Sequence, residues 1–374
     1  MNRLNLGRDL YIKGRIGWRG LNKDEYLEKS EYKIINATAL MDGYVDWNNC
    51  GYISKERYEE SEEIMLKEGD ILISKDGTLG KIGYVKNLKG YCTVASGIFV
   101  LRNIISDILD FDYLYHVLKS NIFKDFINRN KALGSTINHL YQRDLENFEL
   151  DLPSIEKQHK IAKVLNDLDE KIDKNNKIND NLEELAFSMF LFNFGNKKDN
   201  GTIGNIVKEN SKSSVKVGEA KDIKGDFPFF TSGESILEWN DYLVDGRNLY
   251  LNTGGNADVK FYVGKAMYST DTWCITTINN YSDYLYLYFK SIKSALDKKF
   301  FHGSGLKHLQ KPLLKNEKIY IPNNEEIRKF NEKVQPMFDT ISANENENKR
   351  LNSLKEFLLP LLMNGQINVD DIDI

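Results

Sequence analysis

Residues 152–192 read LPSIEKQHKIAKVLNDLDEKIDKNNKINDNLEELAFSMFLF, and they carry the spacing of one long helix. Starting at Ile161, apolar and amide side chains recur in alternate steps of four and three residues, as in a helix that packs lengthwise on another helix. Pro153 and Ser154 mark the N-terminal boundary of the run, and Gly195 follows its end. The sequence therefore predicts a coiled-coil helix of roughly 38 residues, ~57 Å long at ~1.5 Å per residue.

The same pattern returns once, 169 residues later and without a gap. The seam of this second copy runs from Phe330 to Leu358. Positions that keep their identity in both copies, given by the numbers of the first copy, include Gly134, Ser135, His139, Leu140, Leu145, Pro153, Glu156, Ile172, Asn175, Asn179, Leu182 and Leu185. Because only two copies exist and each is far larger than a solenoid repeat, we interpret the chain as a tandem duplication.

If the two helices pair in an antiparallel manner, one register satisfies nearly every layer of the seam. Its polar layers are the pairs Asn175 with Asn348 and Asn179 with Asn344. Leu168 against Lys355 is the mismatch, and a lysine there can extend its ammonium group to water. Since buried amide layers fix register at some cost in stability, we expect these asparagine pairs to be in contact.

The chain of 374 residues is 41% hydrophobic and 28% charged, and its net charge is −4. No apolar run approaches the ~18 residues of a membrane span, and the N-terminal segment lacks the apolar stretch of a signal peptide. We therefore expect a cytoplasmic protein without membrane contact. Cys50, Cys92 and Cys274 lie far apart, without the spacing of a disulfide framework or a zinc site, so we expect no metal. No cofactor-binding glycine motif follows a predicted strand, so we expect no cofactor either.

Motifs that would indicate catalysis are missing from the sequence. The segment 77–81, GTLGK, resembles part of a phosphate-binding loop, but Lys75 replaces the first glycine and Ile82 stands where a magnesium-binding hydroxyl is needed. The chain also lacks the proline-containing loop with which amino-methyltransferases hold a flipped base. His139 and His308, at the repeat junctions, are conceivable acid–base groups, but their duplication favours a packing or DNA-facing role.

Five segments, in this order, resemble a known family. They are GDILISKDGTLGKIGYV (69–85), GSTINHLYQRDLENFELDLPSIEKQHKIAKVLNDLDEKI (134–172), DFPFFTSGES (226–235), GSGLKHL (303–309) and LLMNGQI (361–367). The combination covers nearly the whole chain and is similar to the specificity (S) subunit of type I restriction-modification systems.

The resemblance implies an α+β fold with two small α/β target recognition domains in tandem. Two long helices would separate these domains and form an antiparallel coiled coil with pseudo-twofold symmetry. The corresponding parts are 1–151, the first target recognition domain, 152–195, the first long helix, 196–321, the second target recognition domain, and 322–374, the second long helix and tail.

The same resemblance implies a non-catalytic function. Each domain would read one half of a bipartite, asymmetric site in double-stranded DNA. The helices would dock two methyltransferase (M) subunits and, through them, restriction (R) subunits.

Glycine-rich loops with cationic, amide or hydroxyl side chains occupy matching places in the two halves, and we expect them to face DNA. The loops are residues 15–19, 75–81 and 134–136 in the first half and 231–233, 252–256 and 303–307 in the second. The candidate contact residues are Arg15, Trp18, Arg19, Lys75, Thr78, Lys81, Ser135, Thr136, His139, Thr231, Ser232, Asn252, Asn256, Ser304, Lys307 and His308. Residues 13–21, KGRIGWRGL, equally fit a tight turn whose tryptophan belongs to the core.

Two other functions fit parts of the sequence. The acidic total suits a coiled-coil adaptor that binds only protein, which salt-dependent binding to duplex DNA would contradict. A self-sufficient restriction or methylation enzyme would need catalytic motifs that the sequence does not show.

Overall fold

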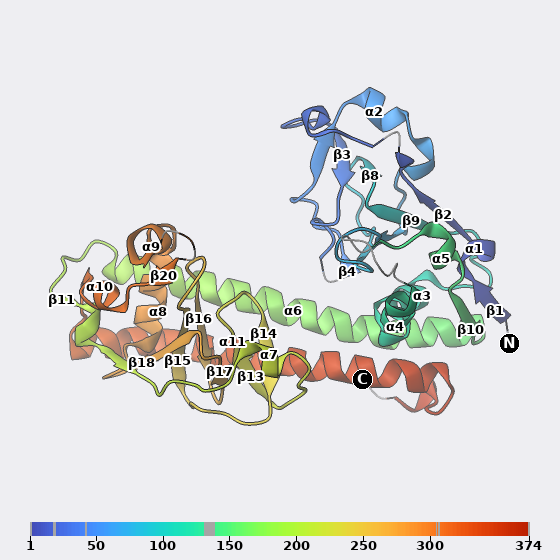
Figure 1. Cartoon of the computed structure of the whole chain (residues 1–374). Helices are drawn as coiled ribbons and strands as arrows, with labels where there is room; N and C mark the ends of the chain where they lie inside the picture. The colour runs from blue at the N-terminus through green and yellow to red at the C-terminus, as the bar shows by residue number, and fades with distance from the viewer. Residues whose placement is uncertain are drawn as a thin grey trace. The chain divides into compact units, whose positions relative to one another are not determined.

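A computed structural model of the chain describes residues 2–17, 20–41, 43–130, 139–303, 305 and 307–372 (Figure 1). The chain divides into two compact units, residues 1–171 with 351–374 and residues 172–350. Two helices of 40 residues each, α6 (Ile155–Phe194) and α11 (Asn324–Met363), therefore contribute to both units. The predicted pair of long helices is confirmed.

The strands of the first unit pair in three groups. Its elements before α6 are β1 (Asn2–Asn5), α1 (Leu6–Asp9), β2 (Leu10–Gly14), β3 (Tyr32–Ile35), β4 (Gly43–Tyr44), β5 (Gly51–Ile53), α2 (Lys55–Glu59), β6 (Ile71–Ser74), β7 (Ile82–Tyr84), β8 (Tyr91–Val94), β9 (Ile98–Asn103), α3 (Phe111–Lys119), α4 (Asn121–Asn130), α5 (Gln142–Glu146) and β10 (Glu149–Leu152). The sheets have the orders β2-β9-β6-β7-β4 and β5-β3-β8, and β1 pairs with β10. Strands β6 and β7 form an antiparallel hairpin whose loop is residues 75–81.

Strand β6 is buried on both faces and separates two cores of the first unit. Ile71 and Ile73 belong to the large core that also contains Leu165 and Leu358 of the long helices. Leu72 points to the opposite face, into a smaller core under β3 and β8. Because side chains alternate along a strand, one short apolar run can close both layers.

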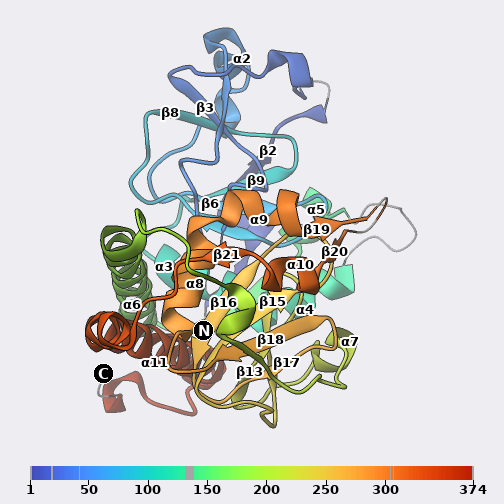
Figure 2. The same ribbon diagram turned by 90° about the vertical axis from the view of Figure 1, so that its left-hand side faces the viewer.

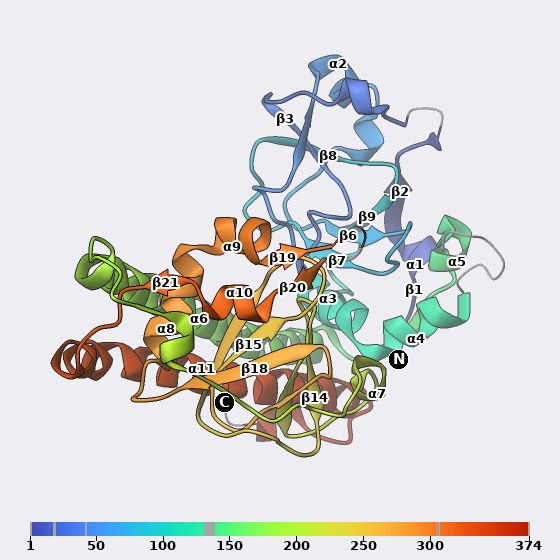
Figure 3. The same ribbon diagram turned by 60° about the vertical axis from the view of Figure 1, so that its left-hand side comes forward.

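The second unit repeats this arrangement. Its elements are β11 (Gly201–Thr202), β12 (Val207–Glu209), α7 (Val217–Ala220), β13 (Phe227–Phe230), β14 (Ile236–Trp239), β15 (Arg247–Asn252), β16 (Val259–Val263), β17 (Met267–Tyr268), β18 (Thr272–Thr277), α8 (Ser282–Ser291), α9 (Lys293–Phe300), β19 (Phe301–His302), β20 (His308–Leu309), α10 (Lys311–Lys315) and β21 (Lys318–Ile319). Its larger sheets have the orders β12-β18-β15-β16 and β14-β13-β17, and the antiparallel pair β15–β18 can be followed in Figure 3.

Corresponding strands make the same pairings in both units, although their sequences differ. The parallel pair β3–β8 matches the parallel pair β13–β17, and the order β9-β6-β7 matches β18-β15-β16. One backbone hydrogen bond is repeated in detail: Leu6 N donates to Phe148 O at 3.1 Å, and Ile203 N donates to Glu317 O at 3.0 Å. The duplication predicted from the helices therefore extends through the domains.

The asparagine layers confirm the predicted antiparallel register of the helices. Within the second unit, Asn175 Nδ2 donates to Asn348 Oδ1 at 2.9 Å and Asn344 Nδ2 donates to Asn179 Oδ1 at 2.8 Å. Figure 2 shows α6 and α11 nearly end-on and beside one another. Lys355, at the expected mismatch, forms an ion pair with Asp169. None of the described helices has both the length and the apolar character that a membrane-spanning helix requires.

Apolar residues recur at helical spacing between Phe111 and Asn128, but the structure has two helices there, α3 and α4. Ser120 has an extended backbone between them. Its Oγ donates to Val117 O at 2.6 Å and accepts from Ile122 N at 3.2 Å. The serine side chain thus takes over hydrogen bonds that a continuous helix would make with its backbone, and the chain changes direction there.

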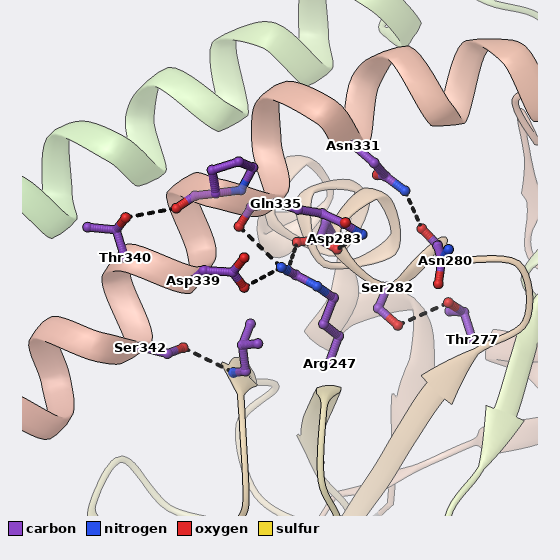
Figure 4. Close-up of polar contacts among 12 residues, drawn as sticks. Arg247, Thr277, Asn280, Ser282, Asp283, Asn331, Gln335, Asp339, Thr340 and Ser342 are labelled. Atoms are coloured by element: carbon purple, nitrogen blue, oxygen red, sulfur yellow. Dashed lines mark hydrogen bonds and ion pairs between the residues drawn. The ribbon is translucent and has the colours of Figure 1, made fainter.

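Arg247 joins the second domain to α11 through buried and exposed carboxylates (Figure 4). Its guanidinium donates to Asp283 at 2.5 Å and to the Gln335 carbonyl at 3.2 Å, and it pairs with Asp339. Asp283 has no exposed surface. Burial raises the pKa of this carboxyl to about 6, and Arg247 opposes the rise.

Candidate nucleic-acid interface

The loop between β6 and β7 is closed by its own serine. Ser74 Oγ donates to Thr78 O at 2.6 Å and accepts from Lys81 N at 2.8 Å. Gly77 and Gly80 have φ of 69° and 74°, a left-handed backbone that glycine adopts without strain. The tight turn leaves the side chains of Thr78 and Lys81 exposed. No side chain of the described residues pairs with the Lys81 ammonium group, so it can meet a phosphate.

Lys75 lies deeper at the start of the same loop. Its Nζ lies 4.6 Å from the centre of the Phe99 ring, and burial lowers its pKa. The backbone carbonyl of Lys75 accepts from Leu140 N at 2.9 Å. This bond is part of a β-bridge between Asp76 and His139, which brings two segments far apart in sequence together.

Around His139 the structure gathers an aromatic and cationic cluster that the sequence interpretation missed in part. The Asp76 carboxylate bonds His139 Nδ1 and holds the ring. The Tyr141 ring packs edge-on at 4.7 Å from the His139 ring, and the Arg143 guanidinium lies 5.2 Å from the Tyr141 ring. Tyr141 and Arg143 follow His139 by two and four residues in the segment HLYQR. This proximity in sequence could have identified them as members of the cluster.

Arg15 lies in the interior and does not point to solvent. It is 2% exposed, and its guanidinium donates to Val94 O at 3.0 Å and to the hydroxyls of Ser61 and Thr93 at 3.4 Å. Burial, followed by the nearby Arg57, lowers its pKa. Since every polar end of this side chain already has a protein partner, we leave Arg15 out of the proposed DNA contacts.

In the second unit Asn252 closes the loop after β15, as Ser74 closes the loop after β6 in the first unit. It ends β15 as Ser74 ends β6, and it is buried. Its Nδ2 donates to Gly254 O at 3.1 Å and to Asn256 O, and its Oδ1 accepts from Asp258 N at 2.8 Å. Asn252 therefore shapes the loop, while the exposed Asn256 at its tip remains a candidate contact.

The same β-bridge supports this second loop. Gly254 pairs with His308, and Leu309 N donates to Thr253 O at 3.0 Å. A glycine thus stands where Asp76 stands in the first unit. Within the described residues, no side chain bonds the exposed His308 ring. Lys307 is half-buried and pairs with Asp297 at 2.6 Å.

The remaining candidate contact residues lie in a turn of the second unit or outside the described residues. Thr231 is buried, and its Oγ1 donates to Ser235 O at 2.6 Å and accepts from Gly233 N at 3.2 Å, so it closes a turn. Ser232 lies half-buried beside it. Trp18, Arg19, Ser135, Thr136 and Ser304 lie outside the described residues.

A family model described as "Type I restriction modification DNA specificity domain" matches the chain twice, over residues 17–184 and 196–356. Each match takes in one domain and much of the long helix that follows it. The repeat found in the sequence and in the sheets therefore coincides with two copies of one known domain.

Relatives resemble the chain along most of its length. The "Type I restriction enzyme MjaIX specificity subunit" of Methanocaldococcus jannaschii is 25% identical, covering 87% of this chain and 86% of the relative. The putative MjaX specificity subunit of the same organism is 24% identical, covering 94% and 90%. The crystal structure of a type I system S subunit from M. genitalium has a TM-score of 0.59 at 17% identity, covering 96% of this chain and 95% of that one. The last similarity concerns the fold.

Proposed function

This chain belongs to the type I restriction modification DNA specificity domain family, and on that premise we propose that it is a non-catalytic specificity subunit. It reads a bipartite, asymmetric site in double-stranded DNA, one half with each domain. Its long helices dock two methyltransferase subunits and, through them, restriction subunits. A methyltransferase partner would flip and methylate the base, while this chain supplies the sequence selection.

The observation that supports this proposal most strongly is that the same β-bridge lies under two different loops, one in each unit. In both units, a loop after the central strand is bridged to the segment with the repeated histidine. The side chains on the loops differ: Asp76, Thr78 and Lys81 in the first unit, Gly254 and Asn256 in the second. A repeated strand order and bridge with different groups on the two loops suits two readers of different base sequences.

Docking of two similar partners is supported by apolar side chains that the protein leaves exposed on both long helices. On α6 they include Ile178, Leu185 and Phe192, spaced by seven residues, together with Leu191, and on α11 they are Leu354 and Phe357. Leu185 and Leu354 are equivalent positions of the repeat, and they are 50% and 39% exposed. Exposed apolar stripes at helical spacing are typical of surfaces that receive a partner helix.

The proposal is tested by co-expressing the chain with the methyltransferase subunit of its native system and mapping the methylated bases. We expect one two-part recognition sequence. Lys81→Ala should reduce methylation because it weakens recognition of the first half-site. Asn256→Ala should reduce methylation because it weakens recognition of the second half-site. The loss of one phosphate contact at Lys81 should also reduce the slope of log K against log salt by about 1. Lys177→Ala, an exposed lysine on α6, serves as the control.

Two results would contradict the proposed function. Methyl transfer by the purified chain without any partner would show that it is an enzyme. Binding of the methyltransferase without any salt-dependent affinity for duplex DNA would instead favour a protein-binding adaptor.

A further inference from the structure

A cavity of about 270 Å³ lies in the second unit, where β16 and α8 meet the two long helices. Two kinds of side chain dominate its lining. The carboxylates are Asp180, Glu183 and Glu345, and the aromatic rings are Phe261, Tyr286 and Phe338. Among the described residues, neither a lysine nor an arginine lines it. The cavity therefore combines negative charge with aromatic surface.

A stacked pair of rings forms the aromatic wall. The centroids of Phe261 and Tyr286 are 5.1 Å apart, with an angle of 17° between the ring planes. The buried Phe338 packs edge-on against both rings, at 5.0 Å and 5.6 Å between centroids, and holds them in place. Phe261 and Tyr286 are only half-buried, so part of their surface can be reached from the cavity. The face of an aromatic ring attracts a cation.

The carboxylates differ in whether they have a partner. Glu183 accepts from the Tyr286 hydroxyl and pairs with Lys290 at 2.9 Å. Asp180 and Glu345 are exposed, and neither has a partner among the described residues. The cavity walls nevertheless surround the Glu345 carboxyl, and this burial, followed by the charge of Glu183, raises its pKa to about 7. Because both effects disfavour the charged form, a cation bound beside Glu345 would be stabilising.

The first unit contains the same pair of rings. Tyr115 corresponds to Tyr286, because both end the sequence DYLY in the helices α3 and α8. Tyr84 corresponds to Phe261, because β7 pairs with β6 as β16 pairs with β15. The centroids of Tyr84 and Tyr115 are also 5.1 Å apart. The ring pair is therefore part of the duplicated fold, and the two units can be compared.

In the first unit, lysines of the same domain cover these rings. Lys86 Nζ lies 4.5 Å from the centre of the Tyr84 ring, and Lys119 Nζ lies 5.5 Å from that of Tyr115. Lys290, which corresponds to Lys119, is bound to a carboxylate in the second unit. No cation of the described residues covers the ring pair there. The fold thus accepts ammonium groups at these rings, and the second unit leaves the rings to a cation from outside the domain.

The chemistry of the cavity selects among ligands. A phosphate would be repelled by the carboxylates of Asp180 and Glu345. A metal ion is not favoured, because no group of three or more ligating side chains occurs among the described residues. Ring faces together with carboxylates match a guanidinium or alkylammonium group, which donates hydrogen bonds and also packs against aromatic surface.

We propose that this cavity binds an organic cation with a guanidinium or alkylammonium group. The cation donates to Glu345 and packs against the Phe261 ring. An arginine or lysine side chain of a partner subunit and a free polyamine both present this chemistry. The site is additional to the proposed reading of DNA and to the exposed stripe of α6, so the isolated chain is sufficient to test it.

The test compares methylguanidinium with N-methylurea, a neutral molecule of similar shape. Saturation-transfer NMR on the purified chain should detect methylguanidinium at millimolar concentration and should not detect N-methylurea. Glu345→Gln should weaken binding of methylguanidinium about 10-fold, through the loss of one charge-assisted hydrogen bond. Glu184→Gln is the matched control, because Glu184 is an exposed glutamate of α6 that does not line the cavity. It should bind like the wild type.

The variant chosen preserves the fold. Glutamine has the shape of glutamate and removes the repulsion from Glu183, so the melting temperature of Glu345→Gln should equal or exceed that of the wild type. Phe261→Leu, which keeps an apolar group but removes the ring, should also weaken binding of methylguanidinium. Equal signals from the two probes would overturn the inference. So would wild-type affinity of Glu345→Gln for methylguanidinium.

The methyltransferase subunit distinguishes the two sources of the cation. If a side chain of that subunit fills the cavity, the assembled complex should exclude methylguanidinium, and Glu345→Gln should weaken assembly. If the occupant is a free polyamine, the complex should bind putrescine as tightly as the isolated chain does. Failure of the chain to bind any methyltransferase subunit would overturn the proposed function and leave the result on the isolated chain intact.

Discussion

The buried carboxyl of Asp283 links protonation to the attachment of the second domain. Arg247 and Asp339 are the charged groups that face it, and burial outweighs Arg247 in raising its pKa to about 6. An aspartate in an unfolded chain titrates near 3.9. A folded-state pKa above the unfolded value means that its contribution to stability is complete below about pH 4 and is lost as the pH rises to about 6.

We therefore predict that the wild type loses stability relative to Asp283→Asn as the pH rises from about 4 to about 6.5, by at most about 3 kcal/mol. Above that range the difference should stay constant. Urea unfolding followed by fluorescence at a series of pH values measures it. Asp339→Asn is the control, because its carboxylate is half exposed. If the difference in stability between the wild type and Asp283→Asn does not change with pH, titration of Asp283 is not the cause.

At the scale of elements, sequence periodicity was sufficient for the two long helices but not for the loops. The register of Asn175 and Asn348 followed from heptad spacing, because one antiparallel alignment satisfied nearly all layers. The fate of Arg15 could not be predicted, since its acceptor Val94 lies 79 residues away on a strand whose neighbours the sequence does not specify. Asn252 was predicted as a contact residue for a different reason: its loop-closing bonds to Gly254 and Asp258 depend on the folded conformation of the loop, which the sequence does not show.

The exposed stripe of α6 gives a prediction at this scale. Leu185→Glu should weaken binding of one methyltransferase subunit at least 10-fold, because a carboxylate would be buried in an apolar contact. Native mass spectrometry should then show one bound copy instead of two. Lys177→Glu places the same group on the exposed polar surface of the helix and should leave two copies bound. Two copies on the Leu185→Glu variant would exclude this stripe as a docking surface.

At the scale of the whole molecule, the first unit is discontinuous in sequence. Its main core contains Leu358, Leu359, Leu362 and Val369 from the segment 351–374. Each large buried side chain contributes about 2–5 kcal/mol, so together they match the stability of a typical domain. The core of the second unit lies within one continuous segment, residues 172–350.

A chain that stops after residue 350 should therefore lose the fold of the first unit and keep that of the second. Hydrogen exchange resolved by peptide is the appropriate measurement. We expect β6 and β9 to exchange rapidly and β15 and β18 to remain protected. A chain that stops after residue 372 provides the control. Undiminished protection of β6 in the shorter chain would show that the helix end is dispensable for that core.

This discontinuity sets an order of events during synthesis on the ribosome. Residues 1–171 emerge first, but the side chains that complete their core are added only after residue 350. At about 5–20 residues per second, the first unit waits roughly 10 to 40 s for these side chains, whereas the second unit has its complete sequence at residue 350, about 1 to 5 s earlier than the first. We expect the later half to fold before the earlier half, so that the nascent first half is the part of the chain that depends on chaperones.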